Sequence, residues 1–338
     1  MKFDCRRRVW LRVVPFVVAP ILLWFAFRGL KFGQFVQTFG RMRPGWFFSA
    51  VALYGLLFLP AAWRWHLVLK LSQKAVSFGA TLRSSLIGHF FYTTFFGVVG
   101  GDSAKAILYA NRFGFSRTAI LATAPLDRLL GFGGSLIFAL LALVIGAASG
   151  GFRHSLSITM QWPIRSLTVL LLVAVIAGVL FKRRAAHASI VRFWFLLREQ
   201  TRALARSRQT IVKGIACGFV VQVALSGVLA FNLAAVSTGP IAWEKQLWTF
   251  PLVIAISALP ISIGGLGTRE GAALMLWSSY GIANVDALAA SLLTLAVALF
   301  WAAVAAMLLF VTENDRRATI WRAIWKRDAE VPLNVRAA

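Results

Sequence analysis

Two glycine-rich stretches place charged residues inside otherwise apolar sequence. Residues 98–105 read VVGGDSAK and residues 262–269 read SIGGLGTR, so a cation lies four positions after the second glycine of each pair. Diglycine permits a tight chain reversal because glycine lacks a Cβ atom. A helix that begins after such a reversal exposes unpaired N–H groups, and these groups together with a nearby cation form an anion site. The two stretches therefore predict binding of an anionic group such as a phosphate.

Six charged residues are the candidate ligands of this headgroup site. The cations would attract a phosphate, and the acids would orient the cations or bind an amine. We expect the six side chains to line one cavity between the two reversals, and we expect five glycines to act as the hinges. The six ligands are Asp102, Lys105, Asp127, Arg128, Arg269 and Glu270, and the hinges are Gly100, Gly101, Gly264, Gly265 and Gly267.

Each charged pair also has a structural interpretation. Asp102 and Lys105 are three residues apart, which is the spacing of an ordinary ion pair that caps a helix at the membrane surface. Asp127 and Arg128 would be interfacial if their helix began later than expected, and the adjacent residues 269 and 270 could lie at a hairpin mouth. The functional interpretation is favoured for 127 and 128, because ionisable groups deep in a membrane are costly.

Membrane helices are predicted to carry these residues. Of the 338 residues, 59% are hydrophobic and only 14% are charged, whereas soluble domains have about 25% charged residues. Uncharged runs long enough to cross the hydrocarbon core, which takes roughly 20 residues of helix, predict an all-α polytopic membrane protein. Six full spans are expected, at residues 9–27, 44–63, 118–148, 163–181, 212–236 and 287–312.

Two further apolar regions, 84–101 and 246–268, fit full crossings poorly. The first ends at GGD, and the second is interrupted by Pro260 and IGGLG before a short apolar run at 271–285. Each region is interpreted as a re-entrant helical hairpin that enters and leaves by the same face, a geometry that is tolerated where protein or water surrounds it.

The distribution of cations sets the expected sidedness. With two re-entrant hairpins and a cytoplasmic N-terminus, 28 of the 36 Lys and Arg residues lie inside, as the positive-inside rule requires. We therefore predict a multi-pass protein of the bacterial cytoplasmic (inner) membrane with both termini cytoplasmic. Residues 313–338 would form a basic cytoplasmic tail, and 182–213 a basic amphipathic segment on the cytoplasmic leaflet.

The two glycine-rich stretches belong to longer similar segments. RFGFSRTA (112–119) follows the first and SYGIANVDA (279–287) follows the second, and each leads into a long apolar run. The expected sidedness opens the first hairpin inward and the second outward. Residues 84–148 and 246–312 are therefore predicted to be the halves of an inverted repeat within a domain covering 1–312, a plan that recurs in secondary transporters.

Three motifs resemble those of a known family. GGDSAK, APLDRLLG (124–131) and LPISIGGLGTREG (259–271) resemble the lysylphosphatidylglycerol synthetase transmembrane-region family. This family is also called the flippase-like domain family, and it includes a hopanoid-associated branch. The resemblance covers roughly residues 10–312 and implies a membrane module that moves or handles a lipid. The six ligands and five glycines match the family's motifs, with Lys105 in place of an arginine; lysine cannot make arginine's bidentate contact with phosphate.

The expected function is that of a lipid transporter or flippase, not an enzyme. The resemblance does not include the soluble synthetase domain, so lipid synthesis is not expected. The lipid moved would be an anionic or aminoacylated phospholipid, or a polyprenyl or hopanoid lipid. Two alternatives stay open: a membrane-embedded lipid-modifying transferase, and a scaffold for a lipid-synthesising or glycosyltransferase partner. Membrane phospholipids are the expected partners and nucleic acid is not. No metal-ligand or cofactor motif occurs in the sequence.

Overall fold

The computed structural model describes residues 32–72, 74–148, 188–239, 241, 243, 247–257, 266–278 and 280–312. All regular secondary structure in these ranges is helical, and no strand occurs there. The elements are α2 (Phe32–Gly40), α3 (Pro44–Leu71), α4 (Phe78–Phe91), the π-helical turn η1 (Tyr92–Phe96), α5 (Gly97–Phe113), α6 (Arg117–Leu121), α7 (Ala124–Ala148), α10 (Ala188–Arg206), α11 (Arg208–Val236), α13 (Thr249–Ser257), α14 (Thr268–Ser278) and α15 (Asn284–Thr312).

Four helical stretches are long and apolar enough to cross a membrane. They are Pro44–Leu71, Arg117–Ala148, Arg208–Val236 and Asn284–Phe310, and they coincide with four of the six predicted spans. The other two predicted spans, 9–27 and 163–181, lie outside the described residues, as does the predicted tail at 313–338. The protein is therefore a membrane protein with several apolar helices, and the described part of its chain is all-helical.

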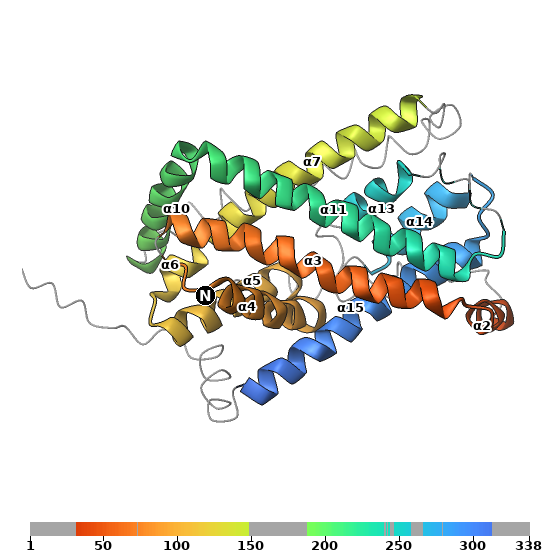
Figure 1. The fold of residues 1–338 in the computed structure, drawn as a ribbon, viewed down its shortest axis with the longest axis horizontal. Helices are drawn as coiled ribbons and strands as arrows, with labels where there is room; N and C mark the ends of the chain where they lie inside the picture. Colours follow the sequence, from red (N-terminus) through yellow and green to blue (C-terminus); the bar gives the residue numbers. More distant parts are fainter. Residues whose placement is uncertain are drawn as a thin grey trace, which may run out of the picture.

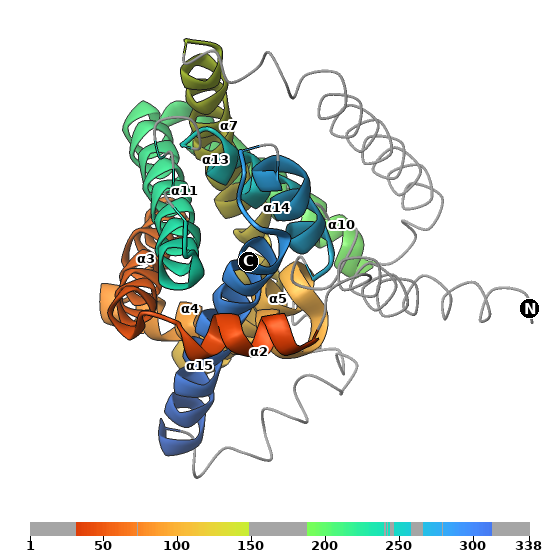
Figure 2. The same ribbon diagram turned by 90° about the vertical axis from the view of Figure 1, so that its right-hand side faces the viewer.

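Helices α3 and α11 form an antiparallel pair along the longest axis of the molecule (Figure 1). The backbone N–H of Arg43, just before α3, donates to Ala235 O near the end of α11 at 2.9 Å. Helix α2 lies at this end of the pair, and α10 lies at the opposite end. Helix α15 contacts α3, α4, α11 and α14, and Figure 2 shows it running from the centre of the molecule to its lower edge.

Glycines allow α7 to lie directly on α11. Gly134 of α7 packs against the backbone of Gly218 and Phe219, leaving no room for a Cβ atom. On the other side of the contact, Gly214 of α11 packs against the side chain of Leu130. The close approach fixes α7, whose first turn carries two of the predicted site residues, relative to the long helices.

Helices α4 and α5 pack against each other, with η1 between them (Figure 1). Gly88 and Gly101 are in contact although they are 13 residues apart, so the chain reverses between them; a Cβ on Gly101 would lie 2.9 Å from Gly88 O. The reversal therefore lies at η1, earlier than predicted. The expected hinges Gly100 and Gly101 lie within α5, because the space that Gly101 leaves is used for close helix packing.

Helices α13 and α14 form the second packed pair. Trp277 Nε1 donates to Thr249 Oγ1 at 2.9 Å, and Trp248 Nε1 donates to Tyr280 OH at 3.1 Å, so the start of α13 lies beside the end of α14. Gly264 and Gly265 lie outside the described residues, and their role as hinges stays a prediction. Gly267 adopts a φ of +82° directly before α14.

The two helix pairs open at opposite ends of the α3–α11 pair. In the first pair, Val76 N–H before α4 donates to the hydroxyl of Tyr109 near the end of α5 at 3.0 Å, beside the end of α3. In the second pair, Trp248 and Trp277 belong to the same core cluster as Val236 at the end of α11. Figure 1 shows α6, which follows the first pair, toward one end of the long axis, and α13 and α14 toward the other.

Each pair is followed by the same kind of turn. Gly114 after α5 has a φ of +71° and Gly281 after α14 has a φ of +77°. The next residue donates its N–H five positions back in both turns: Phe115 to Ala110 O at 3.0 Å, and Ile282 to Trp277 O at 3.3 Å. This is the glycine-terminated helix end in which a left-handed residue closes the last turn. The similarity of the two sequence segments therefore extends to their local backbone.

Candidate functional site

A break between α6 and α7 places Asp127 at a helix start. Thr123 lies in the break, where its hydroxyl donates to Ile120 O at 2.6 Å and accepts Trp65 Nε1–H at 2.9 Å. Asp127 follows in the first turn of α7, where the partial positive charge of the helix N-terminus favours a carboxylate. Only 3% of its side chain is exposed.

Two cations from other helices bind the Asp127 carboxylate. Arg64 of α3 donates Nε–H to Oδ1 at 2.7 Å, and its Nη2 lies 3.5 Å from Oδ2. Lys105 of α5 donates from Nζ to Oδ2 at 3.2 Å. Asp127 therefore joins α3, α5 and α7 at one point.

Lys105 also binds the second carboxylate, that of Asp102. Its Nζ lies 3.1 Å from Asp102 Oδ1. Arg128 of α7 makes a bidentate pair with the same carboxylate, with Nε 2.7 Å from Oδ2 and Nη2 3.0 Å from Oδ1. We call these five residues the ion-pair cluster: Arg64, Asp102, Lys105, Asp127 and Arg128.

The ion-pair cluster holds three cations and two carboxylates, so it carries one excess positive charge. Burial of charges in an apolar bundle is costly unless they are paired and hydrogen-bonded, and each carboxylate here contacts two cations. Arg128 is the most accessible member, with 38% of its side chain exposed. An additional anion would therefore meet the cluster at Arg128.

Two neighbours shape the cluster without carrying charge. The Trp65 ring lies 4.6 Å from Lys105 Nζ, a cation–π contact that compensates part of the lost hydration of the ammonium group. Gly131, one turn after Asp127, lies directly against the Arg64 guanidinium, and a Cβ at this position would collide with it. Both contacts hold a cation against Asp127.

The second predicted motif forms a separate group around Glu270. Its Oε1 accepts hydrogen bonds from Arg269 Nη2 at 3.0 Å and from the Ser291 hydroxyl at 2.7 Å, and its Oε2 accepts Gly267 N–H at 2.5 Å. Arg269 Nε–H donates to the Ser291 hydroxyl at 2.8 Å. We call these four residues the Glu270 cluster. Glu270 is fully buried and satisfies an N–H at the start of α14, as a capping residue does.

The two clusters are separate but are connected through α15. No ion pair joins them within the described residues. Ser291 and Ala298 lie seven positions apart on α15, which is about 10 Å along a helix. Ala298 O accepts a hydrogen bond from His89 Nε2 of α4 at 3.1 Å, and α4 is the partner of the helix that carries Lys105 and Asp102.

The family model described as "Lysylphosphatidylglycerol synthase TM region" matches residues 12–326. The chain belongs to this family. Membership confirms the resemblance that the three motifs carry, and it indicates a membrane lipid-related role. A search among curated proteins found no match.

The predicted site residues of this family member fall into the two clusters. Four of the six lie in the ion-pair cluster: Asp102 and Lys105 from α5, and Asp127 and Arg128 from α7. The other two, Arg269 and Glu270, pair with each other in the Glu270 cluster. The structure therefore brings together the residues of each motif, but the six side chains form two separate clusters and do not line one common cavity as expected.

Sequence reasoning missed Arg64 and Ser291. The predicted span 44–63 ends just before Arg64 because the uncharged run ends there, yet α3 continues to Leu71. The apolar residues Val68 and Leu69, both buried, are the signal that the helix extends beyond the arginine. Ser291 gives no such signal, because a serine in an apolar helix usually bonds its own backbone.

Proposed function

We propose that the protein is a lipid transporter or flippase of the bacterial cytoplasmic membrane. Its substrate would be an anionic or aminoacylated phospholipid, or a polyprenyl or hopanoid lipid, and it would move this lipid without changing it chemically. The observation that carries the proposal is the ion-pair cluster, which holds one excess positive charge among apolar helices. Charged groups in such a position are retained mainly for function.

The lipid phosphate would bind at Arg128. This side chain is the most exposed of the ion-pair cluster, and it already forms a bidentate pair with a carboxylate, the geometry that also suits a phosphate. The phosphate would compete with Asp102 for Arg128, and it would neutralise the excess charge. The large exposed side chains of Leu129, Phe132 and Leu136 on α7 support a position of the acyl chains along this helix.

Movement across the membrane would use the two helix pairs. Their openings at opposite ends of the bundle and the matching turns at Gly114 and Gly281 support the interpretation as two re-entrant hairpins related by an inverted repeat. Rocking of one pair against the other would expose the headgroup first to one face and then to the other. The hydrogen bond between His89 and Ala298 O supports α15 as the element that connects the two pairs.

Reconstitution in liposomes with headgroup-labelled lipids tests this function. Labelled phosphatidylglycerol in one leaflet is followed by quenching from the outside, and the lipids are then extracted and analysed. Movement without a new lipid species, lost in Asp127→Asn and retained in the surface variant Lys70→Gln, is the expected result. A new lipid species would replace the proposal by a transferase, and neither movement nor product with any of the lipid classes named would favour a scaffold for a lipid-modifying partner.

A further inference from the structure

Helix α10 has one face docked onto the bundle. Gln200 and Leu204 are buried, and Gln200 Nε2 donates to Ala119 O of α6 at 3.1 Å. Leu204 packs in one cluster with Leu126 and Leu130 of α7. The docked face of α10 therefore lies against the same turn of α7 that carries Asp127 and Arg128.

The opposite face of α10 presents large apolar side chains. Val191, Trp194 and Phe195 are 60%, 55% and 68% exposed. Three such side chains on one short stretch of helix mark a surface that contacts a membrane or a partner. Trp and Phe beside cationic residues are typical of a helix that lies in the membrane interface.

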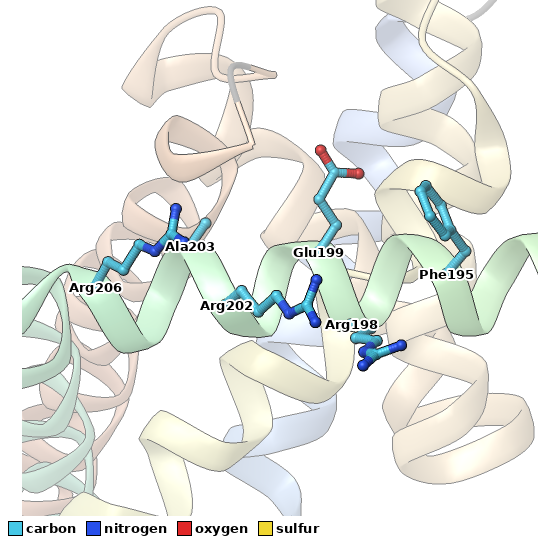
Figure 3. Close-up of a pocket in the computed structure, with 6 residues that line it drawn as sticks. All are labelled: Phe195, Arg198, Glu199, Arg202, Ala203 and Arg206. Atoms are coloured by element: carbon cyan, nitrogen blue, oxygen red, sulfur yellow. The ribbon is translucent and has the colours of Figure 1, made fainter.

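A row of arginines continues this outward face. Arg198, Arg202 and Arg206 follow one another at intervals of four residues, which places them on one side of the helix. Together with Phe195, Glu199 and Ala203 they line a groove of about 390 Å³ (Figure 3). Figure 3 shows the Glu199 carboxylate pointing away from the guanidinium groups of Arg198 and Arg202.

The charge of this groove differs from that of the ion-pair cluster. Within the described residues, no ion pair joins Arg198, Arg202 or Arg206 to a carboxylate, whereas every cation of the ion-pair cluster has one. Three guanidinium groups with a single carboxylate nearby attract an anion strongly. Because arginine presents parallel N–H donors, the groove suits a phosphate group in particular.

We propose that the α10 groove binds an anionic phospholipid from the membrane leaflet that the outward face of α10 contacts. This site is separate from the ion-pair cluster. The phosphodiester lies among Arg198, Arg202 and Arg206. Trp194 and Phe195 insert at the boundary between headgroups and acyl chains. The bound lipid thereby holds α10 against α6 and α7. The match of three arginines to an anionic surface, on a face that also carries exposed aromatic side chains, identifies a lipid leaflet as the occupant.

A photoreactive phosphatidylglycerol with the reactive group in its headgroup tests the site. The full chain is reconstituted in phosphatidylcholine liposomes that contain this probe, irradiated, and mapped by peptide mass spectrometry. We expect labelling of peptides that cover residues 195–206. The variant R198Q/R202Q/R206Q should lose at least about tenfold of this labelling, since each arginine contributes about fivefold to binding of an anionic leaflet.

The control variant R192Q/R208Q/K213Q removes the same charge from exposed neighbours outside the groove, and it should label as the wild type does. A second measurement follows thermal stability in detergent: added phosphatidylglycerol should raise the Tm of the wild type and of the control, but not that of R198Q/R202Q/R206Q. Equal labelling in all three proteins would overturn the site. Competition by millimolar inorganic phosphate would show a soluble-anion site instead. Absence of label on α10 would show that a protein segment covers it.

Discussion

Arg64 of α3 donates its Nε–H to Asp127 of α7 at 2.7 Å across 63 positions of sequence. Both residues lie in helices that are long and apolar enough to span a membrane. A charged hydrogen bond between two such helices fixes their relative rotation and height, and it places a carboxylate where Lys105 also reaches it.

A double-mutant cycle measures this relationship. Arg64→Ala leaves a buried carboxylate with one cation fewer, and Asp127→Ala leaves two buried cations without their common acid. Each change should lower the free energy of unfolding by about 3 kcal/mol. The double variant should be destabilised by clearly less than the sum of the two, with a coupling energy of about 1–3 kcal/mol. Unfolding in mixed micelles gives the three values, and strict additivity would contradict the pairing.

Lys105 should decide whether an anionic lipid is accepted. Its Nζ contacts both acids, so Lys105→Met removes the excess positive charge while each acid keeps its arginine. We expect a folded protein that moves labelled anionic lipid in liposomes at least about tenfold more slowly, with Lys105→Arg retaining more activity than Lys105→Met. The matched control is Lys70→Met, at an exposed cation near the end of α3, and comparable loss in the control would remove Lys105 from the site.

Replacing glycine by alanine should have opposite effects at Gly101, which lies in the contact between α4 and α5, and at Gly79, which lies outside it. A Cβ on Gly101 would meet Tyr92 Cβ at 2.7 Å and Gly88 O at 2.9 Å, whereas Gly79 has nothing within 4 Å. Gly101→Ala should destabilise the protein by about 1–3 kcal/mol through overpacking. Gly79→Ala, in the first turn of α4, should stabilise it by up to about 0.5 kcal/mol, since alanine favours a helix more than glycine does. Thermal unfolding of both variants in one detergent decides between this packing role and a hinge role for Gly101.

The buried carboxylate of Glu270 should be important mainly for structure. Glu270→Ala removes the acceptor of Gly267 N–H and the partner of Arg269, with an expected loss of about 3 kcal/mol. Glu270→Gln keeps an acceptor oxygen and should lose less. Glu199→Ala, at an exposed carboxylate, should change stability by no more than about 0.5 kcal/mol. Equal Tm values for Glu270→Ala and Glu199→Ala would refute the role of Glu270 as the cap of α14.

The sequence was sufficient for the apolar helices and for most of the ion-pair cluster. Long uncharged runs located α3, α7, α11 and α15, because the length of an apolar helix is set by the membrane. Asp127 and Arg128 could be selected because charged residues deep in such a run are costly and are usually retained for function. Arg64 could not be selected by the same rule, since it stands where the run ends and looks like a loop residue.

The geometry of the reversals could not be read from glycine alone. A diglycine allows a turn, but it equally allows two helices to pack closely. Gly101 allows α5 to pack closely against α4 at Gly88. Which cation meets which acid is also a matter of three-dimensional packing. The sequence placed Lys105 three residues from Asp102, and only the arrangement of α5 and α7 shows that it also binds Asp127.

The position of Asp127 in the chain has a consequence for biogenesis. Ribosomes make proteins from the N-terminus, so α3 and α5 emerge before α7, and Arg64 and Lys105 are already present when Asp127 leaves the exit tunnel. A buried carboxylate in a membrane protein is costly unless it is paired. Because both of its partners precede it in the chain, Asp127 can be paired as soon as α7 packs against α3 and α5. The order of synthesis thus suits the order in which these contacts are needed.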